Sequence, residues 1–95
     1  MDDLSALARL ELCKSDADFA RWFLTESDSG FCAVFEQANN EFLAAQFDDG
    51  LRALDVRRYA LNAQRLSDGN LPQTILMRLE EQKSRMREIA SKGGA

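Results

Sequence analysis

The chain has 95 residues, of which 45% are hydrophobic and 29% are charged, a composition typical of one soluble globular domain. The net charge is −4 and there is no histidine, which excludes histidine metal ligands and Ser–His or Cys–His nucleophile pairs. The longest apolar run, residues 31–35, has only five residues, so we expect no membrane-spanning segment.

Three clusters rich in Ser, Asp and Gly, at residues 27–30, 48–50 and 67–70, are typical of turns. The pieces that they separate have helical length: 3–26, 31–47, 51–66 and 71–91. Valine and isoleucine total only four, whereas Ala, Leu, Gln, Glu and Arg dominate, which favours helices over strands. The sequence therefore predicts an all-α fold, a compact bundle of four or five helices with a longer C-terminal helix at about 71–91. We expect residues 1–91 to form one helical domain and residues 92–95 to form a flexible tail.

The first half of the chain carries the aromatic residues. The first piece is predicted to break near Ser15, because Ser15 and Asp18 resemble a helix-capping box. Seven of the eight aromatic side chains lie between positions 19 and 47, which is the cheapest way for a small domain to build a core. We expect these aromatics to be core residues, and Trp22 is the one expected to be partly exposed.

The helix predicted at 51–66 has two apolar faces. One face is suited to the core and comprises Val56, Tyr59, Ala60, Ala63 and Leu66. On another side, Leu54 and Leu61 form a ridge beside Arg58 and Arg65, with Arg57 at the other edge. An apolar ridge bordered by arginines is typical of a protein-binding surface, so these five residues are the predicted binding site. The alternative is that the helix is central and packs on both sides while its arginines extend to water.

The last helix has the clearest start signal, because Asn70 and Gln73 fit a capping pattern with Pro72 in the first turn. A short heptad seam follows, with positions alternating by four and three: Ile75, Leu79, Gln82, Met86 and Ile89. This seam can be covered by the aromatic helices of the same chain or by a second copy. We expect a homodimer through the seam, with a symmetric contact between the two Gln82 side chains.

The two cysteines, Cys13 and Cys32, are too few for a disulfide framework, and each lies among apolar or helical neighbours. We expect both to be reduced and structural, as in the cytoplasm. Two thiols without histidine do not complete a zinc site, and Asp48, Asp49 and Asp55 lack the spacing of a calcium loop. We therefore expect no metal, no cofactor and no catalytic site.

The charges are unevenly distributed along the chain. Residues 1–50 carry eleven acidic and three basic side chains, whereas residues 51–95 carry nine basic and five acidic ones. A helix-turn-helix at 42–61 would present Arg52, Arg57 and Arg58 to DNA, but two aspartates at its turn oppose phosphate. A small DNA-binding regulator that uses the arginines of residues 52–65 is therefore only the alternative function. The first is a non-enzymatic protein-binding module, such as an adaptor, chaperone or inhibitor of bacterial or phage origin. We expect its partner to be another protein rather than nucleic acid or a membrane.

Overall fold

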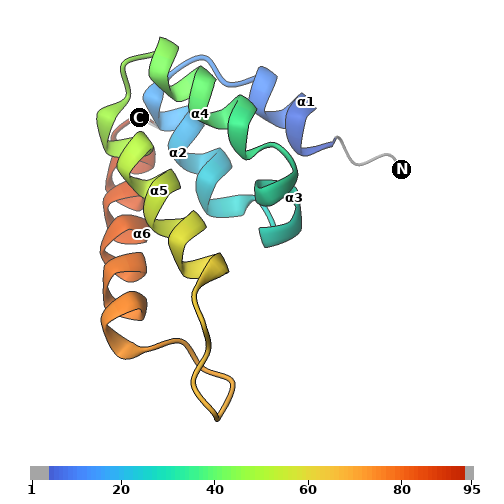
Figure 1. The fold of residues 1–95 in the computed structure, drawn as a ribbon. Coiled ribbons are helices and arrows are strands. Elements are labelled where there is room, and N and C mark those ends of the chain that lie inside the picture. The colour runs from blue at the N-terminus through green and yellow to red at the C-terminus, as the bar shows by residue number, and fades with distance from the viewer. Residues whose placement is uncertain (1–4, 94–95) are drawn as a thin grey trace.

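The computed structural model describes residues 5–93 of the chain, and within this range it is all-helical, without strands. It contains six helices: α1 (Ala6–Glu11), α2 (Asp16–Thr25), α3 (Asp28–Ala33), α4 (Phe35–Ala44), α5 (Asp48–Asn62) and α6 (Gln73–Gly93). The predicted all-α class and the longer C-terminal helix are confirmed (Figure 1). The number of helices is six because two of the predicted helical pieces each divide into two short helices.

Serine side chains define where the first three helices begin. Ser5, Ser15 and Ser27 each accept a hydrogen bond from the backbone N–H three residues later, the geometry of an N-cap. One half of the predicted capping box at Ser15 is confirmed, because Ser15 Oγ accepts from the Asp18 N–H at 3.2 Å. The Asp18 carboxylate accepts from the backbone N–H of Lys14 at 2.9 Å, one residue before the N–H that a capping box uses.

The prediction of a single helix at 31–47 is wrong, because the chain turns at Val34 between α3 and α4. Val34 has φ −122° and ψ 22°, outside the helical region, although no glycine or proline marks the break. The turn lets Phe31 enter the core from α3 and Phe42 from α4. The rings of Phe31 and Phe35 still meet edge to face across the break, with centroids 5.7 Å apart.

The aromatic residues form the core, as the sequence predicts. Six of the seven between positions 19 and 47 are buried, and the seventh, Phe35, is half-buried against them. The expectation that Trp22 is partly exposed is wrong, since its side chain is buried and the residue is only 4% exposed. Its Nε1 donates a 3.2 Å hydrogen bond to the carbonyl of Ala6, so the polar end of the indole is satisfied inside the fold.

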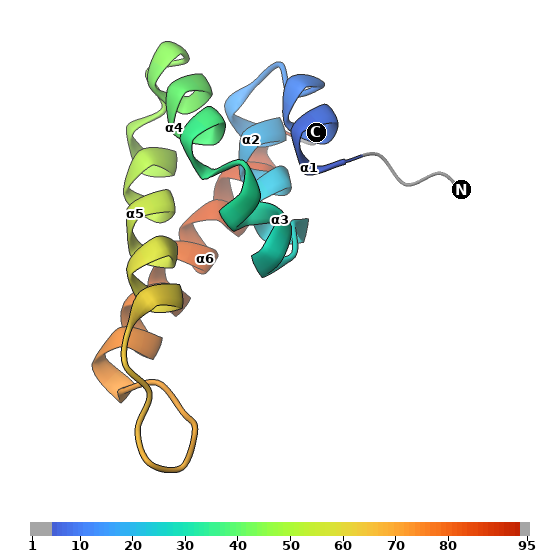
Figure 2. The same cartoon turned by 45° about the vertical axis from the view of Figure 1, so that its right-hand side comes forward.

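Helices α5 and α6 form a hairpin joined by the segment 63–72, which projects from one end of the molecule (Figures 1 and 2). Helix α2 packs against α6 on the inner side of this hairpin. Helix α6 begins at Gln73, two residues later than predicted, because the Pro72 carbonyl accepts the first turn's hydrogen bonds. It continues through Gly93, so residues 92 and 93 of the tail expected at 92–95 belong to the helix, and residues 94–95 lie outside the described residues.

Candidate protein-binding surface

The predicted binding ridge on α5 is only partly a surface. Leu54 is fully buried and Arg57 is only 7% exposed, because α2 and α3 cover this side of the helix. The face expected in the core is instead partly turned to solvent: Tyr59 is 67% and Leu66 51% exposed. The alternative that α5 is central and packs on both sides therefore describes Leu54 correctly, but its expectation that the arginines extend to water is wrong for Arg57. The assignment of Tyr59 and Leu66 to the core is also wrong.

Arg57 is buried because the end of α2 supplies acceptors for its guanidinium. Its Nη1 donates to the carbonyl of Phe23 and its Nη2 to the carbonyl of Glu26, both at 2.7 Å. Nη2 also binds the Asp28 carboxylate at 2.9 Å. The carbon between these nitrogens lies 4.4 Å from the centre of the Phe31 ring. All of these hydrogen bonds and contacts are made within the chain. Arg57 therefore joins α5 to the junction of α2 and α3 and is not available to another molecule.

The other residues of the ridge line two separate hollows. Leu61 is half-buried, Arg65 is exposed, and both line a small cleft of about 100 Å³ with Leu71 and Lys83. Arg65 Nη1 also donates to the carbonyl of Gly69 at 3.3 Å, which holds its side chain along the 63–72 segment. Arg58 lies on a different side of α5 and lines a larger hollow.

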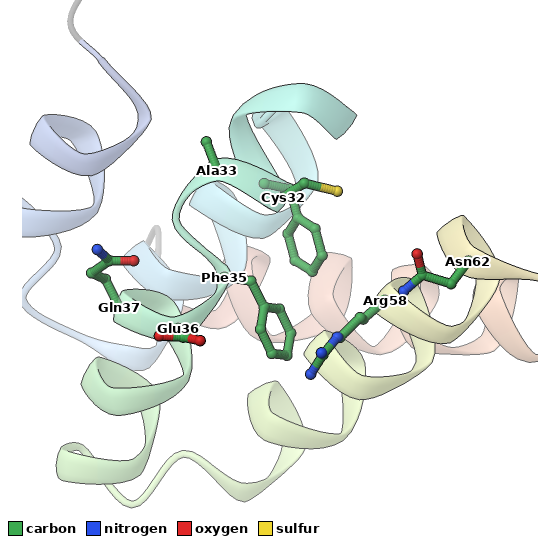
Figure 3. Close-up of a pocket in the computed structure, with 8 residues that line it drawn as sticks. Cys32, Ala33, Phe35, Glu36, Gln37, Arg58 and Asn62 are labelled. Carbon is green, nitrogen blue, oxygen red and sulfur yellow. The ribbon is translucent and has the colours of Figure 1, made fainter.

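This larger hollow, of about 410 Å³, lies between α3, α4 and α5 (Figure 3). Helices α3 and α4 contribute one wall, which includes Cys32, Phe35 and Glu36, and α5 contributes Arg58 and Asn62. The Arg58 guanidinium lies over the Phe35 ring, 4.6 Å from its centroid. Within residues 5–93, no hydrogen bond or ion pair engages its N–H groups, so the ring positions them while they remain free to donate.

Cys32 lies on this wall and is exposed, although free cysteines usually behave as small buried hydrophobic residues. The sequence contains the signal for its exposure, because Phe31, Phe35 and Ala38 share one helical face and Cys32 falls off it. Cys13 is partly buried, and burial, together with the nearby Asp18 carboxylate, raises the pKa of its thiol to about 11. Both thiols are free.

The seam predicted for self-association is largely occupied within the chain. Met86 is fully buried and Ile89 packs against the same core, because α2 covers this part of α6. Ile75, Leu79 and Gln82 are half-buried nearer the start of the helix. The sequence allows the seam to be covered by helices of the same chain or by a second copy. At Met86 it is covered by helices of the same chain. A symmetric contact that included Met86 would require the core to open.

DNA, metal ions and membranes are three further classes of binding partner. In the alternative DNA-binding function, Arg57 would contact DNA, but it is buried and its Nη1 and Nη2 bind the carbonyls of Phe23 and Glu26 and the Asp28 carboxylate. Within residues 5–93, no three acidic or thiol side chains are grouped closely enough to hold a metal ion. None of the helices in this range combines the length and the apolar character that crossing a membrane requires.

Comparison with known proteins finds no matching family model, no matching curated protein and no matching solved structure.

Proposed function

We propose that this chain is a non-enzymatic protein-binding module of the adaptor, chaperone or inhibitor kind, and that the hollow between α3, α4 and α5 receives its partner. The observation that carries the proposal is the arginine–aromatic pair in that hollow. Arg58 is stacked on Phe35 and keeps its donors unengaged among the described residues. Arginine and aromatic side chains are the residues most enriched at the energetic centres of protein interfaces.

The chemistry of the hollow favours a peptide segment that carries a carboxylate beside an apolar side chain. A guanidinium fixed on a ring face can still bind a carboxylate through two parallel N–H groups. The exposed part of Phe35 and the Cys32 side chain offer apolar surface next to it. Gln37 and Asn62, which also line the hollow, have amides that can bind the partner's backbone.

The test is to select binding peptides from a random displayed library and to measure their affinity by fluorescence polarisation. We expect selected peptides to contain an acidic residue next to an apolar one. Arg58→Ala should weaken their binding at least tenfold, because it removes both the charge and the stacked surface. The matched control is Arg87→Ala, since Arg87 lies on α6 and binds Glu80 and Ser84 there. It should change affinity less than twofold.

A second experiment uses the exposed thiol of Cys32 on the wall of the hollow. Attaching a bulky maleimide to Cys32 in a Cys13→Ala background should block the same peptides. Selected peptides that bind Arg58→Ala and the Cys32 adduct as tightly as the unmodified protein would contradict the proposed site. So would a library that yields no binding peptide.

A further inference from the structure

A second groove lies between α5 and α6, and it shares no residue with the hollow around Arg58. It measures about 490 Å³, and its lining comprises Asp55, Val56, Tyr59, Thr74, Ile75 and Arg78. Val56 and Ile75 are half-buried there and lie outside the main core cluster, while Tyr59 is mostly exposed. The apolar surface of this groove is therefore not used by the chain's own core.

The charged side chains along this groove are unpaired. Asp55 on α5 and Arg78 on α6 line the same groove, yet neither makes an ion pair or a side-chain hydrogen bond within residues 5–93. Arg52 and Glu81, each three residues further along the hairpin, are likewise exposed and unpaired in this range. The next charges along the hairpin differ, because Arg85 Nη2 binds the Asp49 carboxylate at 3.1 Å.

The antiparallel hairpin places these charges at matching levels, that is, at the same heights along the axes of α5 and α6. The Asp49–Arg85 pair fixes which residues of α5 and α6 lie side by side. Towards the 63–72 segment, three residues along α5 lead from Asp49 to Arg52, and four residues along α6 lead from Arg85 to Glu81. Because the two helices run in opposite directions, Arg52 and Glu81 therefore lie at about the same level. The next three residues along each helix bring Asp55 level with Arg78, which is why both residues line one groove. Each level of the hairpin thus holds one acid and one base.

We propose that a second copy of this chain docks on the groove, with a two-fold axis parallel to α5 and α6. Such an axis places α5 of one copy against α6 of the other and leaves the level of every residue unchanged. Asp55 then faces the partner's Arg78, and Arg52 faces the partner's Glu81, so both pairs occur twice in the dimer. The two Tyr59 rings close over Val56 and Ile75 between the hairpins.

The order of the charges favours a second copy over an unrelated protein. An isologous interface needs a surface that is complementary to itself. The groove meets this requirement, because α5 carries Arg52 and then Asp55 where α6 carries Glu81 and then Arg78. Exposed ion pairs contribute little binding energy singly, so they set the register while the apolar residues supply most of the affinity. Helix α5, with 15 residues, presents a face about 22 Å long, at the small end for stable dimers. We therefore expect weak association, with a dissociation constant in the micromolar range.

This dimer differs from the one that the heptad seam predicts. Only Ile75 belongs to both surfaces, and Met86 stays in the core of its own chain. The groove also leaves the Arg58 hollow open, so dimerisation and peptide binding can be measured separately.

The test is sedimentation velocity of the full chain across a range of concentrations that reaches about 100 µM, well above a micromolar dissociation constant. We expect wild-type protein to dimerise. Asp55→Arg and Arg78→Asp should each weaken the dimer at least tenfold, because each places like charges opposite one another. The double variant with both changes should recover the dimer, because the exchanged charges again oppose each other across the axis.

Tyr59→Glu tests the apolar part of the interface, and its matched control is Leu43→Glu, a similarly exposed residue on α4. Only Tyr59→Glu should prevent dimerisation. The urea unfolding midpoint of each variant separates loss of the dimer from loss of the fold. Wild-type protein that remains monomeric at about 100 µM would overturn the proposal, and so would a dimer that Tyr59→Glu leaves intact. Failure of the double charge exchange to restore the dimer would refute the two-fold arrangement.

Discussion

The guanidinium Nη2 of Arg57 donates a 2.7 Å hydrogen bond to the backbone carbonyl of Glu26, 31 residues earlier in the chain. Glu26 follows the last residue of α2, where helical carbonyls have no partner of their own. The side chain of Glu26 turns the other way and forms a two-oxygen ion pair with Arg9, at 2.7 and 2.8 Å. One residue thus joins α1, α2 and α5, through its carboxylate on one side and its carbonyl on the other.

Arg57→Ala should lower the free energy of unfolding by about 3 kcal/mol, because it leaves the carbonyls of Phe23 and Glu26 buried without a donor. The ion pair with Asp28 contributes little of this, since the Asp28 side chain is 70% exposed. The neighbouring Arg58→Ala is the matched control, and it should cost less than about 1 kcal/mol because it loses only an exposed ring contact. Urea denaturation measures both. Equal losses for the two variants would contradict the structural role assigned to Arg57.

The Glu26 carboxylate also explains why position 30 is glycine. A Cβ added to Gly30 would collide with Glu26 Oε2, and this carboxylate is held in place by Arg9 and by the Ser27 N–H. Gly30→Ala should therefore destabilise the fold by about 1–2 kcal/mol, even though alanine is the better helix former. Urea denaturation of the single and double variants gives the coupling energy.

In a Glu26→Ala background the collision is absent, so Gly30→Ala should be neutral or slightly stabilising there. An equal cost of Gly30→Ala in both backgrounds would mean that the Glu26 carboxylate is not what excludes a side chain at position 30.

The features that local sequence determines were predictable. The N-cap hydrogen bond at Ser15, the aromatic core and the long last helix each follow from spacings within a few residues. The inward face of α5 was not predictable in this way, because a charged residue in a helix is normally on the surface. Arg57 can be buried only because the end of α2 and the start of α3 bring three acceptors to it.

The binding surfaces were likewise predictable only where local sequence determines them. Arg58 was predicted to bind a partner and does line a hollow, but Phe35, on which it is stacked, was assigned to the core. The turn at Val34 separates α3 from α4 and opens this wall, and no glycine or proline in the sequence announces it. The matching of charge levels between α5 and α6 likewise depends on the register of the hairpin, which only the fold defines.

The thiol of Cys13 should make stability depend on pH in the alkaline range. Its pKa is raised from 9.0 to about 11, first by burial and then by Asp18, so the folded state disfavours the thiolate. The stabilisation from the neutral thiol is complete below about pH 9 and is lost as the pH rises through about 11, because the unfolded thiol ionises first. The free energy of unfolding should therefore decrease between pH 8 and pH 10.5, and Cys13→Ala should remove the part of this decrease that the thiol causes. Urea denaturation at the two pH values measures the decrease in both proteins.

Alkylation gives an independent check on the same group. At pH 8, iodoacetamide should modify Cys32 much faster than Cys13, since the thiolate is the reactive form and Cys13 is both protonated and partly buried. Peptide mapping by mass spectrometry reports the two sites separately. Equal rates at the two cysteines would contradict the raised pKa.

Gln46 at the end of α4 should be replaceable by glycine with a gain in stability. It has φ 58°, in the left-handed region, and its N–H donates to the carbonyl of Leu43 while the Phe47 N–H donates to that of Phe42. These two bonds and the contact between the Phe42 and Phe47 rings, with centroids 5.4 Å apart, form a Schellman motif. Glycine is the usual residue at its left-handed position, because any Cβ there is strained.

Gln46→Gly should therefore raise the free energy of unfolding by about 1 kcal/mol, and Gln46→Val should lower it, because a β-branched side chain is the least tolerant of positive φ. The matched control is Asn40→Gly on the exposed face of α4, which should cost about 0.5 kcal/mol from helix propensity alone. Thermal and urea denaturation of the three variants give the comparison. A loss of stability in Gln46→Gly as large as that in Asn40→Gly would show that α4 continues through position 46 instead of ending in this motif.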